Sequence, residues 1–268
     1  MTATSSFLIS PGAKVNLRKR STDDDGGLSK QEAEAGLAKA CARLFELQAL
    51  MYAERRHALL VVLQAMDTGG KDSTIRAIFT GMNPQGCRVT SFKAPHELER
   101  MHDFLWRVHQ AVPPLGDIGI FNRSHYEDVL IVRVRKLVAE KRWKARYDHI
   151  NAFEEMLHDE GVTIRKFFLH ISKDYQKERL QRRLDDPEKR WKFNPDDLKE
   201  RARWDDYQEA YEEALSRCST KHAPWYVIPA ENRPFRNLLV ARALVEALEA
   251  LDMKYPKPMF DPADLRIE

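Results

Sequence analysis

The sequence has no long hydrophobic run, few cysteines and almost no excess of charge. No stretch of about 18 apolar residues occurs in the 268-residue chain, so we expect no membrane-spanning helix. The three cysteines, Cys41, Cys87 and Cys218, are widely spaced and form no CxxC pair, which favours a reducing compartment over a disulfide scaffold. The first residues lack a basic stretch before a long apolar segment, so we expect no signal peptide. These absences predict a cytoplasmic protein without a membrane partner.

The charge balance also limits the classes of function. There are 44 Lys and Arg against 41 Asp and Glu, and the formal net charge of +3 is too small to indicate nucleic-acid binding by itself. The sequence contains no internal repeat and no low-complexity segment. With 43% hydrophobic residues the chain can bury a substantial core, and its length predicts one large domain or a domain with an insertion.

The most informative stretch is an apolar run at 59–63 that leads into Gly69, Gly70 and Lys71. This order predicts a strand, a phosphate-binding loop and a helix. Glycines let successive backbone N–H groups point at phosphate oxygens, and the following helix adds its positive N-terminal end. The lysine would then contact the phosphates as a point charge. The alternative is a glycine turn that closes an ordinary strand–helix unit, but a position directly after a buried strand is the context that the motif requires.

The loop departs from the general pattern G-x-x-x-x-G-K-[ST] at two positions. Ala65 stands at the first glycine, and Asp72 stands at the Ser or Thr that normally reaches magnesium. Asp67 inside the loop and Ser73 one place late indicate a metal held by a carboxylate of the loop itself, because magnesium prefers hard oxygen ligands. We therefore predict Asp67 as a metal ligand.

A second polar segment, 122–128, follows the apolar run 117–121 and contains Arg123 and Asp128. In phosphate-loop enzymes an acid from another strand joins the loop in holding magnesium, and an arginine can spread the charge of a transferring phosphoryl group. We predict these roles for Asp128 and Arg123. The alternative for Asp128 and its acidic neighbour is a cap on a helix dipole.

Two other polar residues lie near predicted strand ends. Lys93 follows the predicted strand 88–92, at the edge where ligands of open α/β sheets bind, although a solvated loop lysine is the alternative. His125 is expected to pack or form a hydrogen bond rather than to act in catalysis.

Strands and helices alternate along most of the chain. Ser29 and Glu32 predict a capping box for a first helix, residues 95–112 predict a helix with an apolar face, and residues 150–158 predict an amphipathic helix that follows a partly helical segment. This alternation predicts an α/β fold with a parallel, doubly wound sheet. The predicted strands lie at 59–65, 88–92, 117–121, 163–171 and 223–230, and the predicted closing helix lies at 234–251. The predicted helix 95–112 places Leu98, Met101, Leu105, Trp106 and His109 on its apolar face.

The pattern changes between residues 173 and 220, where there is almost no strand signal. Between Gln176 and Lys192 the sequence has seven Lys or Arg against four Asp or Glu, around a break at Pro187. A charge run of this kind is often only a solvated helical face. The functional alternative is a helical lid that closes basic residues over phosphates and excludes water. We predict an N-terminal arm at 1–27, a domain at 28–251 that includes this lid, and a tail at 252–268.

Together these residues resemble the family-2 polyphosphate kinases over roughly residues 28–251. The resemblance is carried by residues 65–72, by Phe-Asn-Arg-Ser-His-Tyr-Glu-Asp-Val-Leu at 121–130, by Arg183 with 187–192, and by Ala-Pro-Trp at 223–225. The aspartate at position 72, unusual for a phosphate loop in general, matches the pattern of that family. The resemblance implies a P-loop kinase core similar to thymidylate kinase, with a helical lid. It further implies a homo-oligomer that transfers a terminal phosphoryl group between inorganic polyphosphate and AMP or ADP, giving ADP or ATP, with Mg²⁺ or else Mn²⁺ as cofactor.

The resemblance also implies roles for particular residues. Asp67 and Asp128 match the metal carboxylates, and Lys71 and Arg123 match the phosphate clamps. Glu127 lies in His-Tyr-Glu-Asp, which is similar to the subgroup that accepts both AMP and ADP. The lid contacts are Arg179, Arg183, Lys189 and Lys192, and the other predicted substrate-binding residues are Gly69, Gly70, Asp72, Ser73, Lys93, Asn122, Glu127 and Arg133.

Two other functions fit parts of the pattern. An ATP-dependent nucleoside monophosphate kinase would use the same scaffold but would need an adenine site for its donor. A nucleotide-regulated binding module could use the basic lid to bind nucleic acid, although a full set of metal carboxylates and phosphate clamps argues against it. The sequence leaves open the reaction direction, the range of nucleotide acceptors, the chain-length preference and the role of Asp72.

Overall fold

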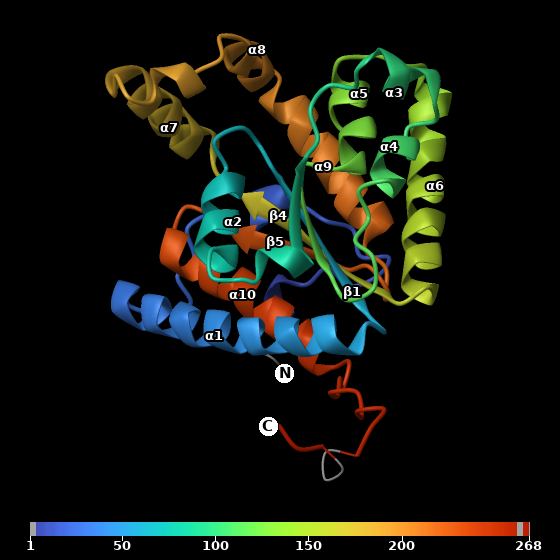
Figure 1. The fold of residues 1–268 in the computed structure, drawn as a ribbon. Coiled ribbons are helices and arrows are strands. Elements are labelled where there is room, and N and C mark those ends of the chain that lie inside the picture. The colour runs from blue at the N-terminus through green and yellow to red at the C-terminus, as the bar shows by residue number, and fades with distance from the viewer. Residues whose placement is uncertain (1–3, 262–264, 268) are drawn as a thin grey trace.

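The computed structural model describes residues 4–261 and 265–267. Its centre is a five-stranded, all-parallel sheet in the order β2-β3-β1-β4-β5 (Figure 1). This confirms the predicted α/β fold with a parallel sheet. The strands are β1 (Ala58–Ala65), β2 (Cys87–Ser91), β3 (Ile118–Asn122), β4 (Val162–His170) and β5 (Trp225–Pro229).

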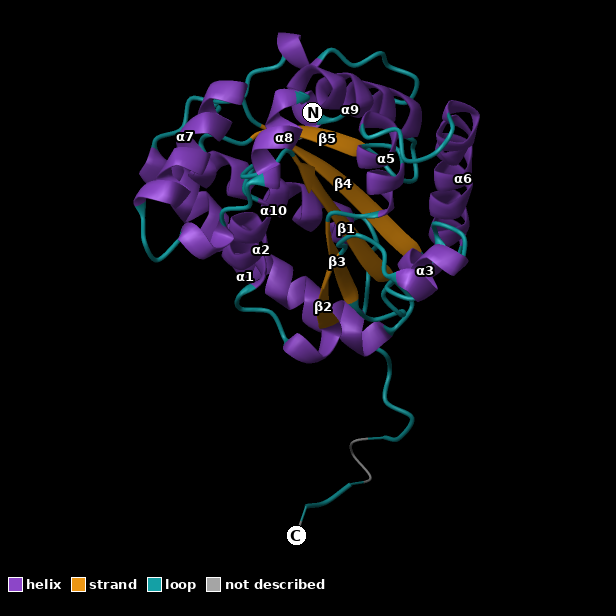
Figure 2. Cartoon of the chain, turned by 90° about the horizontal axis from the view of Figure 1, so that it is seen from above, coloured by secondary structure: helices purple, strands orange, loops and turns teal. Residues whose placement is uncertain are grey.

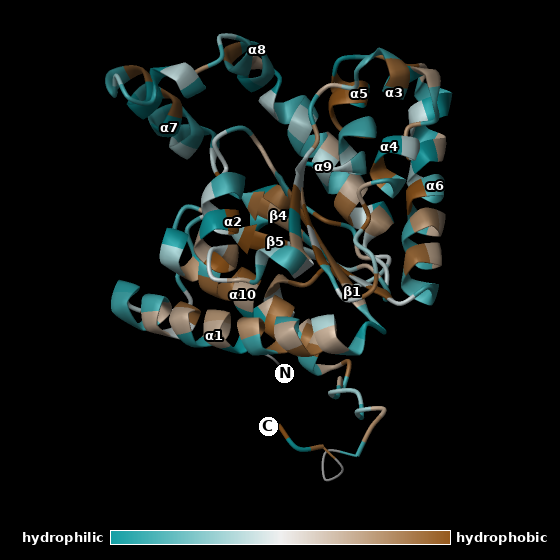
Figure 3. Cartoon of the chain, in the orientation of Figure 1, coloured by the Kyte–Doolittle hydropathy of each residue, from teal (hydrophilic) through white to brown (hydrophobic). Residues whose placement is uncertain are grey.

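Helices cover both faces of this sheet (Figure 2). On one face α1 (Lys30–Glu54) and α10 (Arg233–Glu249) pack against each other, with α2 (Lys71–Phe79) beside them. On the other face lie α6 (Glu140–Asp159) and α9 (Trp204–Cys218). Because helices cover both faces, all eight residues of β1 are buried, which explains the continuous apolar run in the sequence. In Figure 3 the central strands are largely brown, the colour of hydrophobic residues.

The remaining helices are short or lie outside these two layers. They are α3 (Glu97–Met101), α4 (Trp106–His109), α5 (Ile131–Val134), α7 (Lys173–Asp185) and α8 (Asp196–Ala202). Single 3-10 turns are η1 (Ser5–Phe7), η2 (Leu17–Lys19), η3 (Pro84–Gly86), η4 (His125–Asp128) and η5 (Arg190–Lys192). None of the helices in the described part of the chain is long and apolar enough to cross a membrane.

The start of α1 confirms the predicted capping box. Ser29 Oγ accepts a hydrogen bond from the Glu32 backbone N–H at 3.2 Å, and the Glu32 carboxylate accepts one from the Ser29 backbone N–H at 2.9 Å. Both bonds satisfy donors that the first turn of a helix leaves unpaired. The capping box spans only four consecutive residues, so the local sequence is enough to predict it.

The predicted continuous helix at 95–112 is wrong. The segment forms two short helices, α3 and α4, and the Asp103 carboxylate accepts a hydrogen bond from the Leu105 backbone N–H at 2.9 Å between them. A short polar side chain of this kind competes with the helical backbone pattern and starts a new helix. Of the predicted apolar face, Leu98 is 52% exposed and Met101 78% exposed.

The segment before β4 also differs from the prediction. Residues 140–159 form the single helix α6, whereas the sequence predicts an amphipathic helix at 150–158 that follows a partly helical segment. Trp143, Tyr147 and Ile150 are buried at helical spacing, so one apolar stripe continues from the first part of α6 into the second.

The predicted lid segment, 173–220, divides into two parts. In Figure 1, α7 and α8 project beyond the sheet at one end, whereas α9 runs back along it. Tyr207, Tyr211 and Leu215 of α9 are buried in the core. The part of the segment that is free to act as a lid is therefore α7, η5 and α8, and lid closure itself stays a prediction.

The N-terminal segment packs against the domain along much of its length. Ile9, Val15 and Leu17 are buried, and the Val15 backbone N–H donates to Ser216 Oγ of α9 at 2.9 Å. Positions 1–3 of the predicted arm, and positions 262–264 and 268 of the predicted tail, lie outside the described residues. The boundaries at 27 and 252 stay predictions.

Candidate functional site

The predicted phosphate loop connects β1 to α2 at the carboxyl edge of the sheet. Gly70, the residue before α2, has a left-handed backbone with φ of +100°, which glycine adopts without strain. Lys71 folds back over the loop, and its Nζ donates to the Ala65 carbonyl at 3.1 Å. Ser73 Oγ donates to the Gly70 carbonyl at 2.8 Å. The loop is thus a closed turn with a lysine across it, and phosphate binding by this loop stays a prediction.

The second predicted segment meets this loop because β3 pairs with β1. Leu63 is opposite Asn122, and the Arg123 backbone N–H donates to the Leu63 carbonyl at 3.1 Å. Arg123 Nη2 donates to Asp67 Oδ1 at 2.6 Å, in an ion pair between the two segments. Asn122 Nδ2 likewise donates to Asp72 Oδ1 at 2.6 Å. Two side-chain contacts therefore join residues that are 50 and 56 positions apart in sequence.

Cations and carboxylates alternate around the loop. Burial lowers the pKa of Lys71 to about 8, and the positive charge of Arg123 adds to this effect, whereas Asp67 and Glu127 oppose it. Glu127 Oε2 lies 3.6 Å from Arg123 Nη1, and this carboxylate is the largest cause of the raised pKa of Arg123. Lys71 and Arg123 can therefore bind phosphate oxygens as a pair of nearby cations.

Asp128, the second predicted metal ligand, contacts a different arginine. Arg146 Nη1 of α6 donates to Asp128 Oδ1 and to the Asp128 carbonyl, both at 2.9 Å. Burial raises the pKa of Asp128, and Arg146 opposes that shift. In the sequence, Arg146 is marked only by its place in a basic helical segment. The two predicted metal carboxylates, Asp67 and Asp128, are thus each held by a separate arginine.

Within residues 4–261 and 265–267, no group of three or more His, Cys, Asp or Glu side chains is arranged to hold a metal ion. Magnesium commonly uses only one or two protein carboxylates and completes its ligands with substrate phosphates and water. Asp67 and Asp128 supply the hard carboxylate oxygens that such a site needs, so the residues present fit a magnesium ion that arrives with phosphate.

The base of the predicted lid is attached to the phosphate loop. Gln176 of α7 is buried, and its Nε2 donates to the Asp67 carbonyl at 3.1 Å. Farther along, Arg183 Nη1 donates to the Lys192 carbonyl at 3.2 Å and lies 3.5 Å from Asp197 Oδ2. Burial, together with the negative charge of Asp67, raises the pKa of Asp197 to about 6. The sequence did not single out this lid carboxylate, whose charged form the negative charge of Asp67 in the loop disfavours.

Of three other predicted substrate-binding residues, two pair with carboxylates elsewhere and one is exposed. The Arg133 guanidinium pairs with Glu213 of α9 at 2.7 Å. Lys189 pairs with Asp186 within the loop after α7. Lys93 is exposed beyond the end of β2. The structure does not bring these three side chains into contact with the phosphate loop.

Arg236 of α10 is a site residue that the sequence did not indicate. Its side chain is only 2% exposed, and its Nη2 donates to Ser73 Oγ at 3.0 Å, next to the phosphate loop. Burial lowers its pKa to about 10, and the nearby cations Arg233 and Arg179 also lower it. Across the described ranges, no carboxylate forms an ion pair with any of these three arginines. The only sign of Arg236 in the sequence is its place on the buried face of the predicted closing helix.

Comparison with protein families decides the family. The sequence model of the family described as Polyphosphate kinase 2 (PPK2) matches residues 27–256. The chain belongs to the polyphosphate kinase 2 family. This membership confirms the resemblance predicted from the loop and the segment 121–130.

Named members of the polyphosphate kinase 2 family are similar along nearly the whole chain. An AMP/ADP-polyphosphate phosphotransferase from Meiothermus ruber is 57% identical over 256 residues, which cover 94% of this chain and 95% of that protein. An ADP-polyphosphate phosphotransferase from Rhodopseudomonas palustris is 45% identical over 95% of this chain and 92% of its own length.

A solved structure of the polyphosphate kinase 2 family has the same fold. The crystal structure of Polyphosphate Kinase 2 from Arthrobacter aurescens matches with a TM-score of 0.92 and 43% identity, over 96% of this chain and 93% of that chain. With the parallel sheet described above, this match confirms the predicted P-loop kinase-like fold.

The close contact between Gly70 and Arg236 predicts a sensitive position in this kinase. A Cβ atom at Gly70 would lie 2.2 Å from Arg236 Nη1, so Gly70→Ala must displace either the loop or the guanidinium. We expect the KM for the phosphate donor to rise about tenfold or more, because the loop N–H groups lose their alignment. Steady-state kinetics with varied donor concentration measure this change.

Gly27→Ala is the matched control for Gly70→Ala. Gly27 also has a positive φ, +71°, but nothing lies within 4 Å of its Cβ position. The control therefore carries the backbone strain without the steric contact. If both variants gave the same KM, the contact with Arg236 would have no part in donor binding.

Proposed function

We propose that this protein transfers a terminal phosphoryl group between inorganic polyphosphate and AMP or ADP, giving ADP or ATP. The observation that carries the proposal is the contact between Arg123 and Asp67 at the edge of a phosphate loop that also holds Lys71. The names of the Meiothermus ruber and Rhodopseudomonas palustris relatives support the same substrates.

The reaction needs alignment and charge neutralisation more than covalent chemistry from the protein. Lys71 and the loop N–H groups hold the donor phosphates, and Arg123 stabilises the charge that spreads over the phosphoryl group as it moves. The acceptor places an oxygen of its terminal phosphate in line with the donor phosphorus, so transfer is direct. His125, which is buried in the core, is not placed to carry the phosphoryl group. A stable phosphohistidine recovered during turnover would contradict direct transfer.

Magnesium, or manganese in its place, is the proposed cofactor, with Asp67 and Asp128 as its protein ligands. When bound, the ion supplies Lewis-acid neutralisation of phosphate charge. The two carboxylates also orient other residues. Asp67 holds Arg123 toward the loop, and Asp128 fixes the turn η4 to Arg146. Asp72, Ser73 and Asn122 hold the loop in shape.

The lid residues Arg179, Arg183, Lys189 and Lys192 are proposed to close over the polyphosphate. Gln176 ties the base of α7 to the loop, so movement of the helix can be coupled to phosphate binding. Closure would exclude water, which competes with the nucleotide as the phosphoryl acceptor.

Polyphosphate is favoured over ATP as donor because of the arginines beside the loop. Burial, and next the positive charge of Arg233, lowers the pKa of Arg179; burial also lowers the pKa of Arg236, with Arg233 and Arg179 adding to the effect. None of these three arginines forms an ion pair with a carboxylate in the described chain. Uncompensated guanidinium groups attract a polyanion with many phosphates.

The experiment measures AMP phosphorylation with polyphosphate and with ATP as separate donors. We expect turnover with polyphosphate and little with ATP. Phosphorylation from ATP alone would instead identify an ATP-dependent nucleoside monophosphate kinase, and tight nucleic-acid binding without transfer would identify a binding module. Initial rates with AMP, ADP and GMP then define the acceptors, for which Glu127 is the proposed determinant.

The cytoplasmic location, the homo-oligomeric state and the absence of nucleic-acid binding are part of this proposal. Light scattering of the purified protein measures the oligomeric state directly.

A further inference from the structure

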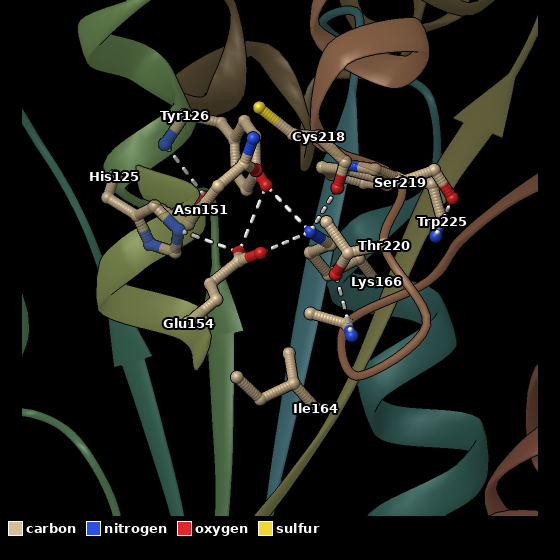
Figure 4. Close-up of polar contacts among 12 residues, drawn as sticks. His125, Tyr126, Asn151, Glu154, Ile164, Lys166, Cys218, Ser219, Thr220 and Trp225 are labelled. Carbon is tan, nitrogen blue, oxygen red and sulfur yellow. Dashed lines mark hydrogen bonds and ion pairs between the residues drawn. The ribbon is translucent and has the colours of Figure 1, made fainter. Parts of the chain in front are cut away.

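A buried cluster of charged and polar side chains lies beneath the turn η4 (Figure 4). Lys166 of β4 is 0% exposed, and its Nζ donates to Tyr126 Oη and to the Cys218 carbonyl, both at 2.7 Å, and to the Glu154 carboxylate. Glu154 of α6 is also fully buried. Its Oε1 accepts hydrogen bonds from Tyr126 Oη at 2.9 Å and from His125 Nε2 at 3.1 Å.

The cluster connects four parts of the fold. Tyr126 and His125 belong to η4, Glu154 to α6, Lys166 to β4, and the Cys218 carbonyl to the end of α9. A buried ion pair is weak evidence for stability, because well-packed apolar residues of similar volume are often as good. The connection to η4 therefore offers a better reason for burying two charges here than stability alone.

The turn η4 carries residues of the phosphoryl-transfer site on its other side. Arg123, just before the turn, has a left-handed backbone with φ of +62°, which a non-glycine residue rarely adopts and which surrounding structure must hold. Ser124 is buried, and its backbone N–H and its Oγ donate to the side-chain oxygen of Gln64 at 3.2 and 3.1 Å. Next along, His125 and Tyr126 point into the cluster, while Glu127 pairs with Arg123. One side of the turn, with His125 and Tyr126, is thus bonded to the buried cluster. The other side, with Arg123 and Glu127, faces the phosphate loop.

We propose that Glu154 and Lys166 are positioning residues for phosphoryl transfer. Through Tyr126 and His125 they hold η4 so that Arg123 and Glu127 face the loop. The kinetic part of this inference rests on the proposed function. We call the hydrogen bonds that join Glu154 and Lys166 to Tyr126 and His125 the anchor. Weakening the anchor lowers kcat, because Arg123 then spends less time in the productive geometry. The affinity for polyphosphate changes less, because the loop and the lid still bind it.

Two double variants distinguish the effect of losing the hydrogen-bond acceptor for Tyr126 and His125 from the effect of losing the two buried charges. Glu154→Gln/Lys166→Met removes both charges but keeps an amide oxygen that can accept from Tyr126 and His125. Glu154→Leu/Lys166→Met removes both charges and that acceptor. We expect the leucine variant to lose about tenfold or more in kcat relative to the glutamine variant, with the KM for polyphosphate within about twofold. Equal kcat in the two variants would overturn the proposal.

Tyr126→Phe is the milder variant, in case the leucine variant does not fold. It removes one hydroxyl and leaves Glu154 and Lys166 in contact. We expect kcat to fall about threefold to tenfold with the KM unchanged, and an unchanged kcat would contradict the anchor. Glu140→Leu/Lys144→Met removes an exposed ion pair of 2.5 Å from the same helix as Glu154 and should leave kcat as in the unmodified protein.

Hydrogen exchange of the backbone amides at 123–130 tests the anchor without any substrate. We expect faster exchange there in the leucine double variant than in the glutamine double variant. If exchange changes but the protein does not use polyphosphate, the proposed function fails and the anchor stands. If polyphosphate is used and neither exchange nor kcat differs between the variants, the anchor fails and the proposed function stands.

Discussion

We expect Asp67→Asn to lower kcat by about 10²–10³-fold, the usual cost of losing one electrostatic contact to the transition state. Asp67 Oδ1 lies 2.6 Å from Arg123 Nη2, and its negative charge acts on Lys71. Asparagine has nearly the same shape and can still accept from Arg123. The variant therefore removes the charge that a magnesium ion needs while it keeps the contact. Steady-state kinetics at several magnesium concentrations measure the effect.

The magnesium dependence distinguishes a metal ligand from a purely structural acid. If Asp67 binds the ion, the concentration of magnesium at half-maximal rate should rise in Asp67→Asn. Asp174→Asn, at an exposed position in the first turn of α7, is the control and should leave both values unchanged. Full activity of Asp67→Asn at the magnesium concentration that saturates the unmodified protein would show that Asp67 is not a metal ligand.

The predictions from sequence succeeded where the signal is local. The capping box of Ser29 and Glu32 spans four residues, and the phosphate loop follows directly from an apolar strand. Parallel strands place their carboxyl ends at one edge, so the meeting of Arg123 with the loop also followed from the order of elements.

The predictions failed, or were silent, where a contact joins distant residues and where a side chain bonds to the nearby backbone. Ser73 and Arg236 are 163 positions apart, and nothing in either local pattern indicates the other. The break in the predicted helix at 95–112 depends on how the Asp103 side chain bonds to the backbone, which periodicity does not report. The cluster of Lys166 and Glu154 was hidden for a similar reason, because each charge occurs in a segment that otherwise indicates an ordinary buried element.

Asp128 combines both kinds of information. Its place after Arg123 in the sequence predicts a metal ligand, whereas its contact in the structure is Arg146. A carboxylate has two oxygens, and the one that accepts from Arg146 need not be the one that faces a metal. Arg146 can then act as a support that fixes the orientation of the ligand, as residues behind metal ligands commonly do.

We expect Asp128→Asn to lower kcat by about 10²-fold or more while the fold stays intact. The asparagine oxygen can still accept from Arg146, and the Asp128 backbone carbonyl, which accepts from the same Nη1 at 2.9 Å, is unchanged. The variant thus loses the negative charge and little of the hydrogen bonding. Thermal unfolding and steady-state kinetics, measured on the same preparation, separate the two effects.

Arg146→Met supplies the comparison that decides the role of Asp128. This variant keeps the carboxylate charge but removes its partner, which is mostly buried and packs over Phe104 at 4.7 Å. If the charge of Asp128 acts on a metal, Asp128→Asn should lower kcat far more than Arg146→Met does. Arg146→Met should instead lower the thermal unfolding temperature more than Asp128→Asn does. If the carboxylate serves only to pair with Arg146, the two variants should lose rate equally. That result would leave Asp67 as the carboxylate on which magnesium binding depends.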